Sequence, residues 1–251
     1  MLPILQVGPV AIQTPGLIIL LGIWIGLSFG EKTCKWFYLQ PEDLYNIITI
    51  AILAGILGAR LTFVLNNLGA FAIKPLNIFS LNLDLLDPIG GLLFGALAIL
   101  IYIQRKKING WDLLNSVTPF LAIMNISIPL ANLASGNGFG AITNRPWGVN
   151  LWGAKRHPTQ IYETLAGFII LTAILIIIKR NAISRYHFSI FSIFIIFIAA
   201  ERLFLEKFRG DSVTILGGFR TNQLIAWIVL AIGLILYIKI PHKNESKKLK
   251  T

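Results

Sequence analysis

The chain has 251 residues, of which 55% are hydrophobic and 13% are charged, and its mean hydropathy is +0.74. This composition excludes an ordinary soluble domain and is typical of an integral membrane protein. The net charge of +11 comes mostly from short loops and a tail beside apolar segments. It therefore indicates topology signals and anionic lipid headgroups rather than nucleic acid. A single cysteine, Cys34, excludes an internal disulfide.

About seven apolar segments follow one another, each close to the roughly 20 residues that cross the hydrocarbon core of a bilayer. They predict an all-α integral membrane protein with a single polytopic domain over residues 1–251. Gly55 and Gly58 in the second segment are small residues that favour close helix packing. The predicted spans are residues 16–29, 44–65, 88–103, 111–131, 160–178, 188–208 and 222–240.

An odd number of spans places the two termini on opposite sides of the membrane. Lys and Arg are more frequent in the tail at 241–251 and in alternate loops than on the other side. This bias predicts an N-terminus outside and a cytoplasmic C-terminus, so the polar loop at 132–160 should face outward. No internal repeat is evident, which makes a small-solute transporter a weaker interpretation.

Residues 132–163 form the longest stretch without an apolar span, and this stretch is rich in glycine and in polar side chains. Glycine lets the backbone turn sharply or approach a ligand closely. Asn132, at the outer end of the fourth span, can bind a substrate oxygen or the loop backbone. Beside the glycine-rich run, Asn132 and Gly140 become candidates for positioning a substrate.

His157 is followed by Pro158, Gln160 and Tyr162 at the start of the fifth span. A histidine can act as a general base near neutral pH. The alternative, which we favour, is a structural segment that caps the fifth helix with Thr159 as the N-cap. The histidines of the chain are far apart in the sequence, which predicts no metal site.

Three charged residues, Arg202, Glu206 and Arg209, lie in or beside the sixth span at spacings that place them on one helix face. Charges at membrane depth are costly and usually face a cavity or a partner. We favour an anion site for a lipid phosphate, since arginine presents a fork that matches phosphate oxygens. An intrahelical ion pair is the alternative. Arg60, inside the second span, either adds to this anion site or bridges helices.

Several motifs resemble those of the prolipoprotein diacylglyceryl transferase family, over most of the chain. The most specific is Arg-His-Pro-Thr-Gln-Ile-Tyr-Glu at residues 156–163. Further similarity lies at residues 7–12, 58–65, 90–92 and 132–149, and in Arg202, Glu206, Arg209, Asp211 and Gln223.

The resemblance implies transfer of a diacylglyceryl group from phosphatidylglycerol to the lipobox cysteine of a preprolipoprotein, with release of glycerol phosphate and no cofactor. It implies a multi-pass protein of the bacterial plasma membrane. The implied partners are phosphatidylglycerol, preprolipoprotein signal peptides and the membrane, without nucleic acid. The implied catalytic residues are Arg202, Glu206 and Asn132, and the implied substrate-binding residues are Arg209, Gly140, Arg60, His157, Gln160 and Tyr162.

Some family positions are substituted in this chain. Ile89 stands where the family has a histidine before two glycines. The segment Ile128–Leu133 keeps the asparagine of the family signature, as Asn132, but not its arginine. These substitutions leave open an alternative function, a catalytically impaired paralogue that binds phospholipid or lipoprotein precursor without transfer.

Overall fold

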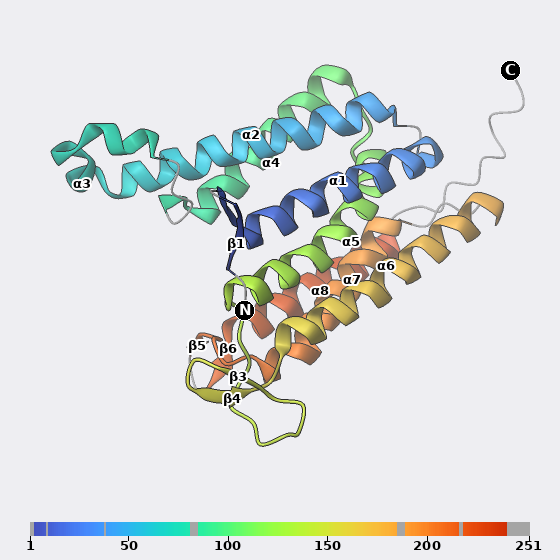
Figure 1. Cartoon of the computed structure of the whole chain (residues 1–251). Helices are drawn as coiled ribbons and strands as arrows, with labels where there is room; N and C mark the ends of the chain where they lie inside the picture. The colour runs from blue at the N-terminus through green and yellow to red at the C-terminus, as the bar shows by residue number, and fades with distance from the viewer. Residues whose placement is uncertain are drawn as a thin grey trace, which may run out of the picture. The chain divides into compact units, whose positions relative to one another are not determined.

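The computed structural model describes residues 3–8, 10–37, 39–80, 85–184, 189–215 and 218–239. Most of these residues are helical, as predicted from the apolar segments (Figure 1). The predicted basic tail at 241–251 lies outside the described residues, as do His187 and His242. The helices are α1 (Thr14–Cys34), α2 (Pro41–Asn66), α3 (Leu68–Ile73), α4 (Pro88–Lys106), α5 (Gly110–Ser135), α6 (Thr159–Ser184), α7 (Ile190–Leu205) and α8 (Thr221–Lys239).

Short antiparallel hairpins and 3₁₀ turns complete the described secondary structure. One precedes α1, a second joins α5 to α6, and a third joins α7 to α8. Figure 1 shows the second and third hairpins at the same end of the bundle that α5 to α8 form. The strands are β1 (Ile4–Val7), β2 (Val10–Gln13), β3 (Val149–Leu151), β4 (Ala154–Arg156), β5 (Thr214–Ile215) and β6 (Phe219–Arg220).

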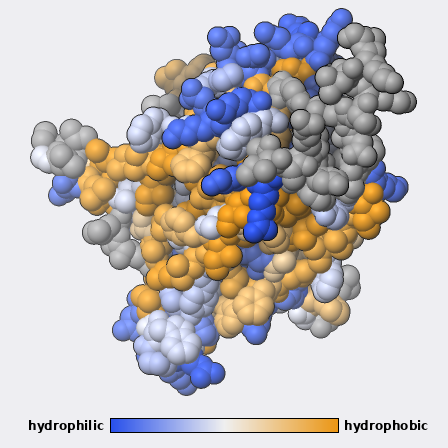
Figure 2. Space-filling view, turned by 90° about the vertical axis from the view of Figure 1, so that its right-hand side faces the viewer, coloured by the Kyte–Doolittle hydropathy of each residue, from blue (hydrophilic) through white to orange (hydrophobic). Residues whose placement is uncertain are grey.

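Among the described residues, 6 helices are long and apolar enough to cross a membrane: α1, α2, α4, α5, α6 and α8. Figure 2 shows apolar side chains over much of the visible helical surface. Helix α7 is equally apolar but has only 16 residues, fewer than the predicted segment 188–208. The count of seven spans and the orientation of the termini therefore stay predictions.

The chain divides into two compact units, residues 37–113 and residues 1–36 with 114–251. In the unit of residues 37–113, α2 packs against α4 through small residues on both helices. A Cβ atom added at Gly58 would collide with Phe94, and one added at Gly90 would collide with Thr62. The predicted packing role of Gly58 is thus confirmed.

The other unit contains every predicted site residue except Arg60. In this unit α7 packs against both α6 and α8. Its core is formed by apolar side chains from α6 and α7, among them Ile174, Ile178 and Phe194, which are almost fully buried. This packing places the N-terminal end of α6 next to the C-terminal end of α7, and the polar cluster described below lies there.

Candidate functional site

The last turn of α7 does not continue as an α-helix. The helix ends at Leu205, residues 206–208 form a 3₁₀ turn, and Arg209 has an extended backbone with φ −76° and ψ 141°. The prediction that Arg202, Glu206 and Arg209 share one helix face is therefore wrong. The structure sends Glu206 to a different set of partners from the two arginines.

Both arginines instead bind Glu163 of α6. The Oε1 atom of Glu163 accepts from Nη1 of Arg209 at 2.7 Å and from Nη1 of Arg202 at 3.0 Å. The Glu163 side chain is only 3% exposed, so this carboxylate is taken out of water between two guanidinium groups. Burying a carboxylate is costly unless it has such charge-assisted hydrogen-bond partners.

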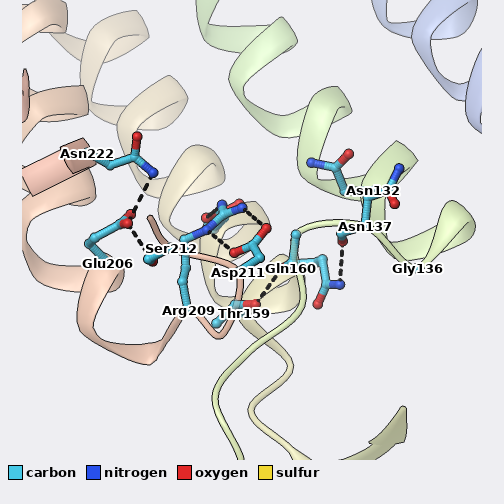
Figure 3. Close-up of polar contacts among 12 residues, drawn as sticks. Asn132, Gly136, Asn137, Thr159, Gln160, Glu206, Arg209, Asp211, Ser212 and Asn222 are labelled. Carbon is cyan, nitrogen blue, oxygen red and sulfur yellow. Dashed lines mark hydrogen bonds and ion pairs between the residues drawn. The ribbon is translucent and has the colours of Figure 1, made fainter. Parts of the chain in front are cut away.

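Arg209 is fully engaged by the protein. Its Nε and Nη2 atoms donate to the two oxygens of Asp211 at 2.9 Å and 2.8 Å, and its Nη1 atom donates to Glu163 (Figure 3). Burial works to lower the pKa of Arg209. The hydrogen bonds to Asp211 and the charge of Glu163 outweigh that effect and raise it. Arg209 therefore stays charged and serves as the fixed centre of this ion cluster.

Arg202 has N–H groups that do not bind Glu163. Its Nη1 atom binds Glu163, while its Nε and Nη2 atoms make no hydrogen bond within the described part of the chain. Its side chain is 38% exposed, compared with 13% for Arg209. Of the two arginines, Arg202 is thus the one that offers unpaired N–H groups to an anion.

Glu206 is buried and holds the connection between α7 and α8. Its Oε1 atom accepts from Ser212 Oγ at 2.7 Å and from Asn222 Nδ2 at 3.1 Å (Figure 3). Arg220 donates to the backbone carbonyls of Glu206 and Arg209. The Oε2 atom of Glu206 is also buried and has no hydrogen-bond partner among the described residues.

The glycine-rich loop is fixed by the residues that begin α6. Thr159 Oγ1 donates to the Gly138 carbonyl at 2.7 Å, and Gln160 Nε2 donates to the Asn137 carbonyl at 2.8 Å (Figure 3). Thr159 is the first residue of α6 and uses its hydroxyl as a donor, so its prediction as the N-cap is wrong. Thr159 and Gln160 are almost fully buried supports of the loop.

Gly140 lies where two backbone segments meet. It forms an antiparallel bridge with Arg209, and a Cβ atom added at Gly140 would collide with the His157 carbonyl. The neighbouring Ala141 N–H donates to the Phe208 carbonyl at 2.8 Å. The close approach that the sequence predicts at Gly140 is therefore an approach between parts of the chain, and a contact with substrate stays a prediction.

Asn132 lies beside the arginine cluster. Its Nδ2 atom and the Nη2 atom of Arg209 are each 3.4 Å from the point where a Cβ atom of Gly138 would lie. Gly138 has a φ of +65°, which favours glycine for a second reason. The structure thus brings Asn132, near the end of α5, close to Arg209, beyond α7, so that the glycine-rich stretch and the charged residues at 202–209 meet at one place.

His157 and Tyr162 belong to an aromatic cluster beside the site. The Tyr162 hydroxyl accepts from Trp147 Nε1 at 2.8 Å and lies 3.2 Å from His157 Nδ1. The rings of both residues pack against Phe208 at centroid distances of 5.2 Å and 5.8 Å. These contacts fit the structural role that we favour for His157, while a role of either residue in substrate binding stays a prediction.

Arg60 lies in the other unit and binds backbone there. Its three nitrogens donate to the carbonyls of Asn77, Ile78 and Leu85, and its guanidinium lies 5.8 Å from the centroid of the Phe71 ring. Arg60 thereby fixes the connection between α2 and α4. Its predicted role in the anion site stays a prediction.

The model of the family described as prolipoprotein diacylglyceryl transferase matches residues 3–239. This chain belongs to that family. Curated relatives named phosphatidylglycerol–prolipoprotein diacylglyceryl transferase include one from Clostridioides difficile, 30% identical over 92% of both chains. Others are from Streptococcus pneumoniae, 28% identical over 97% of this chain and 94% of the relative, and from Finegoldia magna, 26% identical over 89% of both.

Membership of the diacylglyceryl transferase family confirms the family resemblance and makes the chain a multi-pass membrane enzyme. The relatives give no support to the alternative of an impaired paralogue. Within this family member, no cluster of His, Cys, Asp or Glu in the described ranges could hold a metal ion.

Sequence reasoning missed the role of Glu163 and underrated Asp211. Both residues stand in the family motifs quoted above, yet the sequence analysis gives neither of them a role or a partner. A buried acid that follows a Pro-Thr-Gln entry to a membrane helix was a usable signal, because such an acid needs a cationic partner. The chain offers few cations at that depth, and Arg202 and Arg209 are among them.

Proposed function

We propose that this protein transfers the diacylglyceryl group of phosphatidylglycerol to the lipobox cysteine thiol of preprolipoproteins in the bacterial plasma membrane. The observation that supports this most directly is the arginine pair on Glu163. Arg209 is fixed by its two carboxylate partners, and Arg202 keeps N–H donors and partial exposure beside it. An exposed guanidinium next to a rigid ion cluster is suited to bind a lipid phosphate.

The chemistry assigns a distinct task to each group. The thiolate of the substrate cysteine attacks the glycerol carbon that carries the phosphate, the C–S bond forms, and the C–O bond breaks with release of glycerol phosphate. Arg202 holds the departing phosphate, whose negative charge grows as the C–O bond breaks. Asn132 positions a headgroup oxygen from the α5 side, and buried Glu206 keeps the connection after α7 in place.

The proposal is tested by lipidation of a reporter preprolipoprotein in a bacterium depleted of its own transferase. The adduct is identified by gel shift and by mass. We expect the chain to restore a diacylglyceryl adduct and Arg202→Ala to abolish it. Arg180→Ala is the matched control, since Arg180 is an exposed arginine at the other end of α6.

Two results would overturn the proposal. One is the absence of an adduct although the chain is expressed and inserted in the membrane. The other is full activity of Arg202→Ala, which would remove Arg202 from the site. Thermal unfolding of both variants in detergent shows whether a loss of activity is a loss of fold.

A further inference from the structure

The hairpin between α5 and α6 presents apolar side chains outward. Four residues of this segment, here called the hairpin surface, are Ile142, Trp147, Val149 and Trp152, with exposed fractions of 70%, 56%, 45% and 64%. They lie on a polar connection. On an apolar membrane helix, contact with lipid tails would account for exposed apolar side chains, but that explanation does not apply to this connection. Exposed apolar groups gathered in this way mark an interaction site.

Trp152 occupies a position that the backbone disfavours for it. The two residues at the tip of the hairpin, Trp152 and Gly153, have φ angles of 53° and 74°. Such turns favour Asn-Gly or Gly-Gly, and a bulky residue with positive φ is strained. The Nε1 atom of Trp152 donates to the Gly136 carbonyl at 3.1 Å, yet most of the ring remains exposed. Burial within the chain therefore does not account for a tryptophan at this turn.

The charge around the hairpin surface has one sign. Arg145 and Lys155 lie on the same segment, and Arg145 stacks 6.0 Å from the centroid of the Trp147 ring. Neither of these cations forms an ion pair within the described ranges. The sequence holds no Asp or Glu between Asn132 and Glu163. An anionic partner is thus complementary to this surface.

The position of the hairpin close to the ends of membrane helices favours a lipid partner over a peptide. Its strands β3 and β4 begin 14 residues after α5 ends and close three residues before α6 begins, and Figure 1 shows them next to the ends of these helices. Main-chain hydrogen bonds give affinity to a peptide that adds to a sheet edge, and these strands of 3 residues offer few of them. Figure 2 shows hydrophilic and pale side chains at the lower end of the view, where Figure 1 places the hairpin.

We propose that the hairpin surface docks on the anionic phospholipid headgroups of the leaflet at that end of α5 and α6. Tryptophan and basic residues together are the combination that settles at the membrane–water interface. Docking holds the loop of Gly138 and Gly140 at headgroup depth, beside the Arg202–Glu163–Arg209 cluster. The proposal depends on insertion in a membrane and not on transfer activity.

The test uses the full chain with Cys34→Ala and Asn150→Cys, labelled with an environment-sensitive fluorophore at the exposed residue 150. The protein is reconstituted in phosphatidylcholine vesicles with or without phosphatidylserine, an anionic lipid other than the proposed donor. We expect quenching by a headgroup-attached spin label that is stronger with phosphatidylserine, and protection from aqueous iodide in both kinds of vesicle. Lys155→Gln should lower the ratio of docked to undocked probe by about fivefold, as expected for one cation near an anionic surface.

Trp152→Gly removes the ring while suiting the turn, so the hairpin keeps its fold and should lose headgroup quenching. Trp227→Phe on α8 is the control, because Trp227 is an exposed tryptophan outside the hairpin, and it should change nothing. Free access of iodide to residue 150 in all vesicles would overturn the proposal. Protection that appears only after a precursor peptide is added would overturn it as well and assign the surface to peptide. Neither result affects the reporter assay for transfer.

Discussion

Oε1 of Glu163 lies 2.7 Å from Nη1 of Arg209, although 46 positions separate the two residues in the chain. The same oxygen accepts from Arg202 at 3.0 Å. One buried carboxylate on α6 therefore sets the position of two cations, one on α7 and one beyond its end. The site depends on this carboxylate as much as on the arginines that would contact a lipid.

Glu163→Gln should reduce both stability and lipidation. The amide keeps the shape of the side chain but leaves two guanidinium groups without their common counter-charge. Removing one partner of a buried ion pair costs about 3–5 kcal/mol, and the partly exposed Arg202 contributes the smaller share. The midpoint of thermal unfolding in detergent and the yield of reporter adduct measure the two effects.

Glu42→Gln is the matched control for this substitution. Glu42 is an exposed carboxylate in the first turn of α2. Its replacement should change unfolding by no more than about 0.5 kcal/mol, as surface substitutions usually do. Equal effects of the two variants would contradict the role assigned to Glu163.

The two arginines should respond differently to replacement by lysine. Arg209→Lys loses the paired hydrogen bonds to Asp211, and a single ammonium cannot replace the fork, so stability should fall by about 2 kcal/mol or more. Arg202→Lys keeps one contact with Glu163 and should change stability by less than about 1 kcal/mol. Its adduct yield should nevertheless fall about tenfold, because lysine cannot bind phosphate with two parallel N–H groups. A larger loss of stability in Arg202→Lys than in Arg209→Lys would reverse this assignment.

Gly140→Ala should disturb the contact between the two polar segments. The new methyl group meets the His157 carbonyl, which belongs to the backbone and cannot rotate away. We expect a loss of about 1–3 kcal/mol, as for an overpacked core, together with a loss of adduct. Gly16→Ala on α1 is the control, since nothing lies within 4 Å of its added Cβ atom. An unchanged melting midpoint for Gly140→Ala would show that the bridge with Arg209 is not needed.

Two substitutions of Glu206 should weaken the connection between α7 and α8 to different degrees. Glu206→Ala leaves the donors of Ser212 and Asn222 unpaired and should cost about 2 kcal/mol or more. Glu206→Gln keeps an oxygen for both donors and should cost less. Unfolding midpoints and adduct yields of the pair should follow the same order. A variant Glu206→Gln that unfolds normally but forms no adduct would instead give Glu206 a direct part in the chemistry.

The sequence was sufficient to predict most of the long helices and to single out the two polar groups. Apolar length alone located the ends of α4, α5 and α8 within a few residues, because a bilayer core fixes the length of what crosses it. The charged residues near the end of α7 were recognised as site candidates because charge at membrane depth usually faces a cavity or a partner inside the protein.

The partners of individual side chains could not be predicted in this way. Spacing along the chain assumes a helix that continues, and nothing between Arg202 and Phe208 marks the change to a 3₁₀ turn after Leu205. Because the helix changes there, the Glu206 carboxylate accepts a hydrogen bond from Ser212. The carboxylate that binds Arg209 is instead that of Glu163. Which side chains become partners depends on contacts between segments that are distant in the sequence, and local periodicity carries no information about those contacts.

The bridge between Gly140 and Arg209 has a consequence for motion. Ala141 donates to Phe208, and the N–H of Gly210 donates to Phe139 at 2.9 Å, so the loop after α5 and the segment after α7 share backbone hydrogen bonds. The amides of Ala141 and Gly210 should consequently show the same protection factor in deuterium exchange, as members of one cooperative opening unit. A lipid that holds either segment still would slow exchange in both.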